Sequence, residues 1–238
     1  VGTFFTGSAF YVNEMNLSQW KHSAHGLEAL LDPTNVALGL TVLFLSRQLG
    51  AMYLLNTIDN QTIINRVVKQ IKREALPFLT IAVIFVLLLI TQKGYAIDEK
   101  TSKFVFLDAY KYLFNLLEMP VVLILFLAGL ISIIIAIYIA AFKESSKAIW
   151  ICGSGSFMLT LSLFFLAGFN NTAYYPSSYD LQSSLTIYNS SSSHYTLTAM
   201  SYVSLFVPFV IAYIWYAWKA MSKKKLSVDN LKNDEHVY

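Results

Sequence analysis

The sequence predicts an all-α protein, a polytopic transmembrane helical bundle with five full spans and one partial span at its N-terminus. Hydrophobic residues make up 56% of the chain and charged residues only 13%, whereas a soluble domain carries about 25% charge. Five apolar stretches are long enough to cross about 30 Å of hydrocarbon. The Lys and Arg residues lie almost entirely between these stretches. We therefore expect a single integral membrane domain over residues 1–238.

The N-terminal part of the chain holds the partial span and a polar segment. Residues 1–12 are apolar but too short to span a bilayer alone, so we interpret them as the tail of a helix and the chain as a fragment. In residues 13–35, His22, His25 and Glu28 follow one another at a spacing that would place them on one helical face. A metal site would need a further ligand, so we expect a solvated helix at the membrane interface.

The first full span is expected at residues 36–55, after the helix stop and start Asp32-Pro33-Thr34. Arg47 lies near its middle, where a charge costs about 2.5–3.5 kcal/mol on insertion scales and tends to face protein. We expect Arg47 to face protein, and one interpretation is that it is the counter-ion of a carboxylate or a bound anionic group. The alternatives are a hydrogen bond between helices, or a displaced span whose arginine reaches the interface. The sequence does not name its partner.

The other full spans are expected at residues 76–92, 120–142, 149–169 and 199–218. Pro77 suits the first turn of one of these helices and Pro120 opens the next. Between the spans we expect a polar segment (56–75), an amphipathic interfacial piece (93–119), a tight turn (143–147) and an outer loop (170–198). The fourth span contains consecutive small residues that would let a neighbouring helix approach closely. These are Gly153, Ser154, Gly155 and Ser156.

The distribution of basic residues predicts the orientation. Alternate segments lie on opposite sides of the membrane, and one set holds eleven Lys and Arg residues against five in the other. The richer set comprises segments 56–75, 143–148 and 219–238. Because positive charge accumulates on the cytoplasmic side, we expect the C-terminus in the cytoplasm and the Lys-free loop 170–198 outside.

No residue pattern in the sequence announces catalysis. The chain has no P-loop, nucleophile elbow or dinucleotide motif, so we assign no catalytic, cofactor-binding or metal residue. One cysteine, Cys152, excludes an internal disulfide framework, and we expect a buried, inert thiol. The net charge of +3 follows from the topology, and we expect no nucleic acid as partner. A transporter, a channel or a subunit of a larger complex all remain open.

Two blocks of residues carry a resemblance to a known family. The first block is Asp32-Pro33, Gly39, Gly50-Ala51-Met52-Tyr53-Leu54, Thr57 and Arg66. The second is Tyr175-Pro176-Ser177-Ser178, then Ser184 to Asn189, a serine run to Ser193, Tyr195-Thr196-Leu197, Met200 and Pro208. Their order and spacing, and the number of helices between them, resemble the cytochrome bd quinol oxidase subunit II family over essentially the whole chain.

The resemblance implies a non-haem subunit of a respiratory terminal oxidase in the bacterial inner membrane. The family's complex oxidises quinol, reduces dioxygen to water and generates a proton gradient. Its b-type and d-type haems belong to subunit I, which this chain would support. The resemblance implies no cofactor bound by this chain, apart from a structural quinone that the family can hold. The alternative function is a secondary transporter or channel subunit, which predicts broken helices and paired polar residues in two repeats.

Two departures limit what the resemblance transfers. The family's acidic N-terminal motifs are missing here, so no proton-entry residue is assigned. Many members carry a histidine before the Gly-Ala pair, where this chain has Leu49 beside Gln48. The four histidines (His22, His25, His194, His236) lie outside the expected spans, and Met52, Met158 and Met200 suit packing. We therefore expect no haem ligand.

The final outer loop is the part of the chain that we expect to make contacts outside the membrane. Residues 174–198 are mostly polar and contain five tyrosines, a residue type favoured at interfaces. These are Tyr174, Tyr175, Tyr179, Tyr188 and Tyr195. We expect this loop to pack against subunit I or against the neighbouring outer segments.

Overall fold

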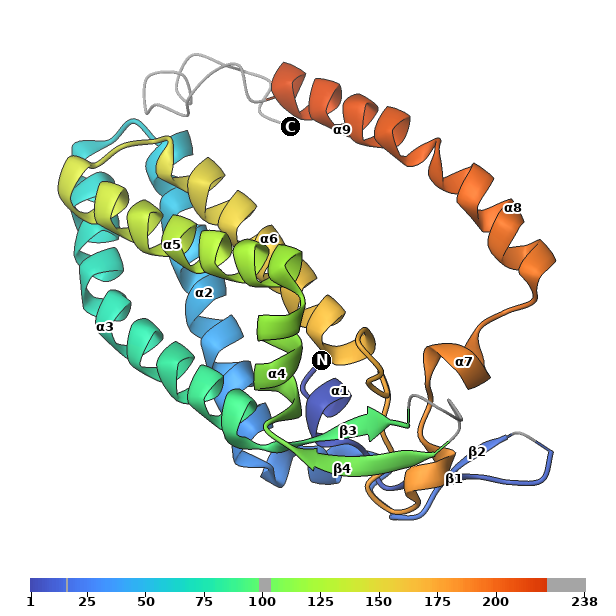
Figure 1. The fold of residues 1–238 in the computed structure, drawn as a ribbon. Helices are drawn as coiled ribbons and strands as arrows, with labels where there is room; N and C mark the ends of the chain where they lie inside the picture. Colours follow the sequence, from blue (N-terminus) through green and yellow to red (C-terminus); the bar gives the residue numbers. More distant parts are fainter. Residues whose placement is uncertain (16, 99–103, 222–238) are drawn as a thin grey trace.

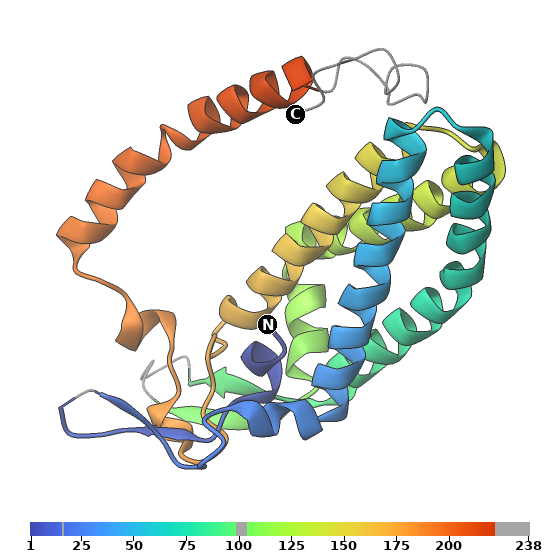
Figure 2. The ribbon, with the colours of Figure 1, turned by 180° about the vertical axis from the view of Figure 1, so that it is seen from behind.

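The computed structural model describes residues 1–15, 17–98 and 104–221. Four long helices lie side by side: α2 (Pro33–Thr57), α3 (Gln61–Thr91), α5 (Pro120–Lys143) and α6 (Ala148–Gly168). A fifth helical segment, α8 (His194–Ser204) followed by α9 (Val207–Met221), stands apart from them (Figures 1 and 2). All five are long and apolar enough to cross a membrane. The predicted bundle with five full spans is therefore confirmed.

The helices begin where the sequence provides caps. The Asp32 carboxylate accepts hydrogen bonds from the backbone N–H groups of Thr34 and Asn35, at 2.8 and 3.2 Å, and Pro33 is the first residue of α2. Asn60 caps α3 in the same way. A cap satisfies N–H groups that have no partner inside the helix. The predicted starts at Asp32-Pro33-Thr34 and at Pro120 are confirmed.

Helix α3 begins at Gln61, well before residue 76, where the span was expected to start. Residues 61–75, expected to be a polar segment, form the first half of the helix, and Pro77 lies inside it rather than in its first turn. The reason is the spacing of Val67, Val68 and Ile71, which are buried against α2 and α5. The four basic residues of this half point away from the core. Burial of an amphipathic face therefore extends the helix beyond its apolar part.

The closest helix pair is α5 and α6. A β-carbon added to Gly129 of α5 would lie 2.9 Å from the carbonyl oxygen of Gly155 of α6, and one added to Gly155 would lie 2.8 Å from Cβ of Ser132. Only glycine permits this approach, which confirms the expectation for Gly155. Gly153 differs, because a β-carbon there would meet nothing within 4 Å. Cys152 is fully buried in the same core, as predicted.

Short elements cover the end of the bundle away from the α2–α3 and α5–α6 turns (Figure 1). Four of them are strands that form two antiparallel pairs. Phe10 lies opposite Trp20 in one pair, and Tyr95 lies opposite Leu107 in the other. We call the whole set the cap. It consists of α1 (Thr3–Thr6), β1 (Phe10–Val12), β2 (Ser18–Trp20), η1 (Leu27–Leu31), β3 (Lys93–Ile97), β4 (Val105–Ala109), α4 (Lys111–Glu118), η2 (Leu181–Ser183) and α7 (Ile187–Ser190).

The cap corrects three expectations. Residues 1–12 form one helical turn and a strand rather than a helix tail, because Gly7 leaves the helix with a φ of +81°. The expected interfacial helix in 13–35 is wrong, since His25 and Gly26 take left-handed backbone conformations that interrupt a helix. The segment 93–119 is amphipathic in α4, as expected, but its first part pairs as β3 and β4.

The final span is not one straight helix. It begins at His194, five residues before the expected start at 199, with Ser193 as its cap. It is interrupted between α8 and α9 at Leu205 and Phe206. Pro208 follows the interruption and has no N–H to donate to the preceding turn. Of the side chains described in α8 and α9, none is buried.

Candidate functional site

The charged pair inside the bundle joins α2 to α3. Arg47 Nε donates a hydrogen bond of 3.0 Å to Glu74 Oε1, and Nη2 of the same guanidinium also contacts this oxygen. Glu74 is buried, whereas the Arg47 side chain is 53% exposed. The partner that the sequence could not name is therefore Glu74, from the segment expected to be a loop. One side of Arg47 faces protein, and its other side is open in this chain.

Gln48 continues the polar contact between the same two helices. Its side chain is fully buried, and Nε2 donates a hydrogen bond of 3.1 Å to the backbone oxygen of Ile71. Within the part of the chain that the structure describes, Gln48 Oε1 has no hydrogen-bond partner. Gln48 precedes Leu49, which was compared with the family's histidine position above. Here it fastens α2 to α3 beside Arg47.

A second polar cluster, the asparagine network, ties the cap to the bundle. Asn115 of α4 is fully buried, and its Nδ2 donates to Leu166 O at 3.2 Å and to Thr172 Oγ1 at 2.7 Å. Asn170 Nδ2 donates to Asn115 Oδ1 at 3.0 Å and to Glu118 Oε2 at 2.6 Å. These bonds satisfy buried amides that would be costly to leave unpaired. They fix the end of α6 against α4.

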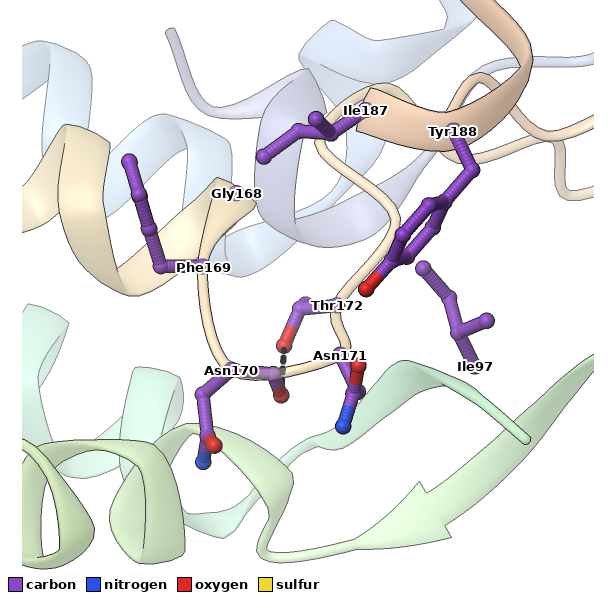
Figure 3. Close-up of a pocket in the computed structure, with 8 residues that line it drawn as sticks. All are labelled: Ile97, Gly168, Phe169, Asn170, Asn171, Thr172, Ile187 and Tyr188. Carbon is purple, nitrogen blue, oxygen red and sulfur yellow. Dashed lines mark hydrogen bonds between the residues drawn. The ribbon is translucent and has the colours of Figure 1, made fainter. Parts of the chain in front are cut away.

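The chain leaves α6 through two left-handed residues that form the floor of a small pocket. Asn170 and Asn171 have φ values of +57° and +53°, a conformation that asparagine tolerates better than most residues. The pocket has a volume of about 210 Å³. Figure 3 shows Tyr188 of α7 pointing toward the 170–172 loop across it, with Ile97 beside the ring.

This pocket brings together groups that sequence reasoning did not connect. Among the described residues that line it are amides, hydroxyls and apolar side chains, and the Tyr188 phenol is the ionisable group among them. Such a lining can hold a small neutral molecule by hydrogen bonds.

Two buried tyrosines hold α1 onto the bundle. The Tyr112 hydroxyl donates to Phe5 O at 3.0 Å, and the Tyr95 hydroxyl donates to Thr6 O at 3.1 Å. Burial raises the pKa of Tyr112 well above its usual range, with a smaller contribution from Tyr95. Burial, and then the charge of Asp32, raises the pKa of Tyr95. Both phenols therefore stay protonated donors at neutral pH.

The loop 174–198 packs, as expected, on neighbouring segments of the cap. Tyr175 contacts the rings of Phe4 and Phe10, and Ser183 Oγ accepts a hydrogen bond of 2.9 Å from Val12 N. This part of the expectation is confirmed. Tyr188 and Tyr195 remain exposed in this chain, so their contact with subunit I stays a prediction.

The histidines and methionines are widely separated. His22 Nδ1 lies 3.8 Å from Glu28 Oε2 in the β2–η1 turn, and His194 begins α8, whereas His236 lies outside the described residues. Met52 is fully buried in the core, and Met200 is exposed. Among the residues that the structure describes, no three His, Cys, Asp or Glu side chains gather as a metal site.

Comparison with known protein families gives one match. Residues 1–221 match the family described as cytochrome bd terminal oxidase subunit II. The matched range includes every helix and strand described above. A search of curated proteins finds no match.

Proposed function

Because the chain belongs to the cytochrome bd terminal oxidase subunit II family, we propose that it is the non-haem subunit of a respiratory oxidase that oxidises quinol and reduces dioxygen to water. The family match and the five apolar helices together support a terminal oxidase subunit with several membrane spans. The observation with the most weight is the length of the match, which takes in the cap as well as all five spans.

We propose that this chain binds no haem. Haem iron takes axial ligands such as His or Met, but the described histidines lie in the cap turns and at the start of α8. Met52 is enclosed by apolar side chains of the core. We therefore assign the b-type and d-type haems of the proposed complex, and the electron transfer between them, to subunit I.

The proposed role of this chain is to support the haem-bearing subunit. The four-helix bundle closes its own core, and the asparagine network fixes the cap on it. The exposed α8–α9 segment and the open side of Arg47 remain available to subunit I. Both features suit a subunit that completes its surface on a neighbour in the membrane.

The proposal includes an orientation and a lipid-soluble ligand. The Lys and Arg distribution supports a C-terminus in the cytoplasm of a bacterial inner membrane and a cap on the outer side. A structural quinone would lie among the membrane-facing helices. Solvent extraction of the purified complex, followed by mass spectrometry, tests for that quinone.

The alternative of a transporter or channel subunit has little support. The α8–α9 interruption resembles the broken helices of transporters, but it lies in a helix with no buried side chain among those described. The polar residues Arg47 and Glu74 satisfy each other across two helices. The family match favours the oxidase.

A reduced-minus-oxidised visible spectrum of membranes tests the proposal. We expect deletion of the gene to abolish the d-type haem signal together with quinol-driven oxygen uptake, and the intact gene to restore both. A strain without another oxidase of this type is required. An unchanged spectrum and unchanged uptake after deletion would refute the oxidase assignment.

A further inference from the structure

An apolar groove opens between α9 and the bundle at the end that is rich in Lys and Arg. Its volume is about 570 Å³. One wall is formed by Ile211, Ile214, Trp215 and Trp218 of α9, and the other by the end of α2 and the start of α6. Gly153 lies in the α6 wall, where a β-carbon would meet nothing within 4 Å. The residues that the structure describes therefore leave this space unfilled.

The composition of the groove lining suits hydrocarbon chains. Most of the exposed lining is apolar, and three of the chain's four tryptophans contribute to it. Tryptophan concentrates where lipid tails meet headgroups. The groove therefore crosses the level of that boundary.

Lysine residues flank the groove lining in the sequence. Lys219 follows Trp218 directly, and its Nζ lies 5.0 Å from the centre of the Trp215 ring. Lys143 and Lys147 are exposed in the turn before α6, where Glu144 is the acidic residue. Tyr53 and Asn56 add polar atoms to the lining. Basic pockets between transmembrane helices bind the headgroups of acidic phospholipids.

We propose that this groove is a binding site for an acidic phospholipid, with acyl chains between α9 and α6 and the phosphate near Lys147 and Lys219. The site goes beyond the oxidase assignment, because it depends on the shape and charge of this chain alone. A bound lipid also explains how α9 is held beside the bundle, since none of the α9 side chains that the structure describes is buried and α9 stands apart from the four-helix bundle in Figure 2.

The test uses the complete complex, purified with the subunits that accompany this chain. The complex is delipidated and incubated with equal amounts of dioleoylphosphatidylglycerol and dioleoylphosphatidylcholine, and the retained lipid is measured by mass spectrometry. With two lysines at the site, each worth about 1 kcal/mol toward an anionic lipid, we expect about thirtyfold enrichment of phosphatidylglycerol. Equal retention of the two lipids would overturn the proposal.

Matched variants locate the site. Gly153→Leu fills the groove and should remove most of the retained lipid. Gly39→Leu is the control, because Gly39 is equally open but lies outside the groove. Lys147→Gln with Lys219→Gln should abolish the preference for phosphatidylglycerol, whereas Arg66→Gln with Lys69→Gln removes the same charge from α3 and should leave it unchanged. Equal lipid retention by Gly153→Leu and Gly39→Leu would refute the site.

Two other occupants give distinct results that would also overturn the proposal. Loss of extracted quinone from Gly153→Leu with unchanged phospholipid would identify a quinone site. Efficient crosslinking of a Gly153→Cys variant to another polypeptide would identify a protein helix. The haem spectrum of the complex is read separately, so a failed oxidase assignment and a failed lipid site are distinguishable.

Discussion

The α5–α6 hairpin and the α8–α9 segment are both membrane-spanning, yet they satisfy their surfaces in opposite ways. In the hairpin, Gly129 and Gly155 bring two backbones together so closely that a β-carbon would clash at 2.9 Å. In α8–α9, aromatic and apolar side chains are exposed along the whole length. The hairpin closes on itself, whereas α8–α9 presents its surface to lipid or to another subunit.

The glycines make the same distinction in more detail. Gly129 and Gly155 are explained by the contact between α5 and α6. Gly39, Gly50 and Gly153 lie in helices that cross the membrane, yet a β-carbon at any of them would meet nothing within 4 Å. Glycine weakens a helix by about 1 kcal/mol relative to alanine. The open glycines therefore lie on helix surfaces that the described residues of this chain do not cover.

The largest expected loss of stability comes from placing a larger side chain in the close contact between α5 and α6. Gly155→Leu should destabilise the complex by about 3 kcal/mol, because the added atoms have no space between α5 and α6. Gly39→Leu is the matched control on the open side and should unfold at nearly the same temperature as the unchanged protein. Thermal unfolding followed by size-exclusion fluorescence measures both. Similar melting temperatures for the two variants would show that the two sides do not differ.

The second largest loss of stability is expected when the asparagine network between the bundle and the cap is broken. Asn115→Ala should cost about 2 kcal/mol, since Asn170 and Thr172 lose a buried partner. Asn65→Ala is the control, because Asn65 is an exposed residue of α3 and should change stability by less than about 0.5 kcal/mol. Protease cleavage of the cap offers a direct measurement. Equal cleavage of the two variants would contradict a structural role for the asparagine network.

A third effect concerns the phenols beneath α1, and it depends on pH. Tyr112→Phe should cost about 1 kcal/mol through the lost hydrogen bond to Phe5 O. Because burial raises the pKa of Tyr112, the folded state keeps a proton that the unfolded chain releases near pH 10. The contribution of Tyr112 is therefore fully present below about pH 10 and falls as the pH rises above it.

Thermal unfolding between pH 8 and pH 11 measures this slope. The unchanged protein should lose stability above about pH 10 more steeply than Tyr112→Phe. Tyr179→Phe serves as the control, because Tyr179 is exposed in the outer loop. Parallel pH profiles for the unchanged protein and Tyr112→Phe would contradict a buried, protonated phenol.

The smallest effect is expected for Glu74→Gln, which changes the half-open charged pair. Glu74→Gln keeps an oxygen that can accept from the Arg47 guanidinium, which is itself half exposed. Arg47→Gln should destabilise more than Glu74→Gln, because it leaves a buried carboxylate without its counter-ion. A double-mutant cycle with both substitutions measures the coupling. Strictly additive effects would show that the two residues act independently.

The sequence predicts the long apolar elements better than it predicts the elements whose buried residues are few or paired across the chain. The five spans follow from apolar length, and the start of α2 follows from Asp32 and Pro33. The first half of α3 was missed because its basic residues hide the buried stripe of Val67, Val68 and Ile71. The cap was misread because its strands are short and pair across the chain, as Tyr95 does with Leu107.

The site residues divide in a similar way. Arg47 stood out because a charge within an apolar stretch is costly, but its partner Glu74 lay in a segment that looked like a loop. Asn115 and Thr172 were missed entirely, since a lone polar residue in an amphipathic segment gives no sign that it is buried. The spacing of His22, His25 and Glu28 predicted a shared face that left-handed residues in the turn prevent.

The most direct test of the proposed role is the haem content of the complex purified through an affinity tag on this chain. We predict that the preparation shows b-type and d-type haem spectra. After mild dissociation, all haem should remain with the partner polypeptide and none with this chain. A preparation without haem, or haem that stays with this chain after dissociation, would contradict a supporting non-haem subunit.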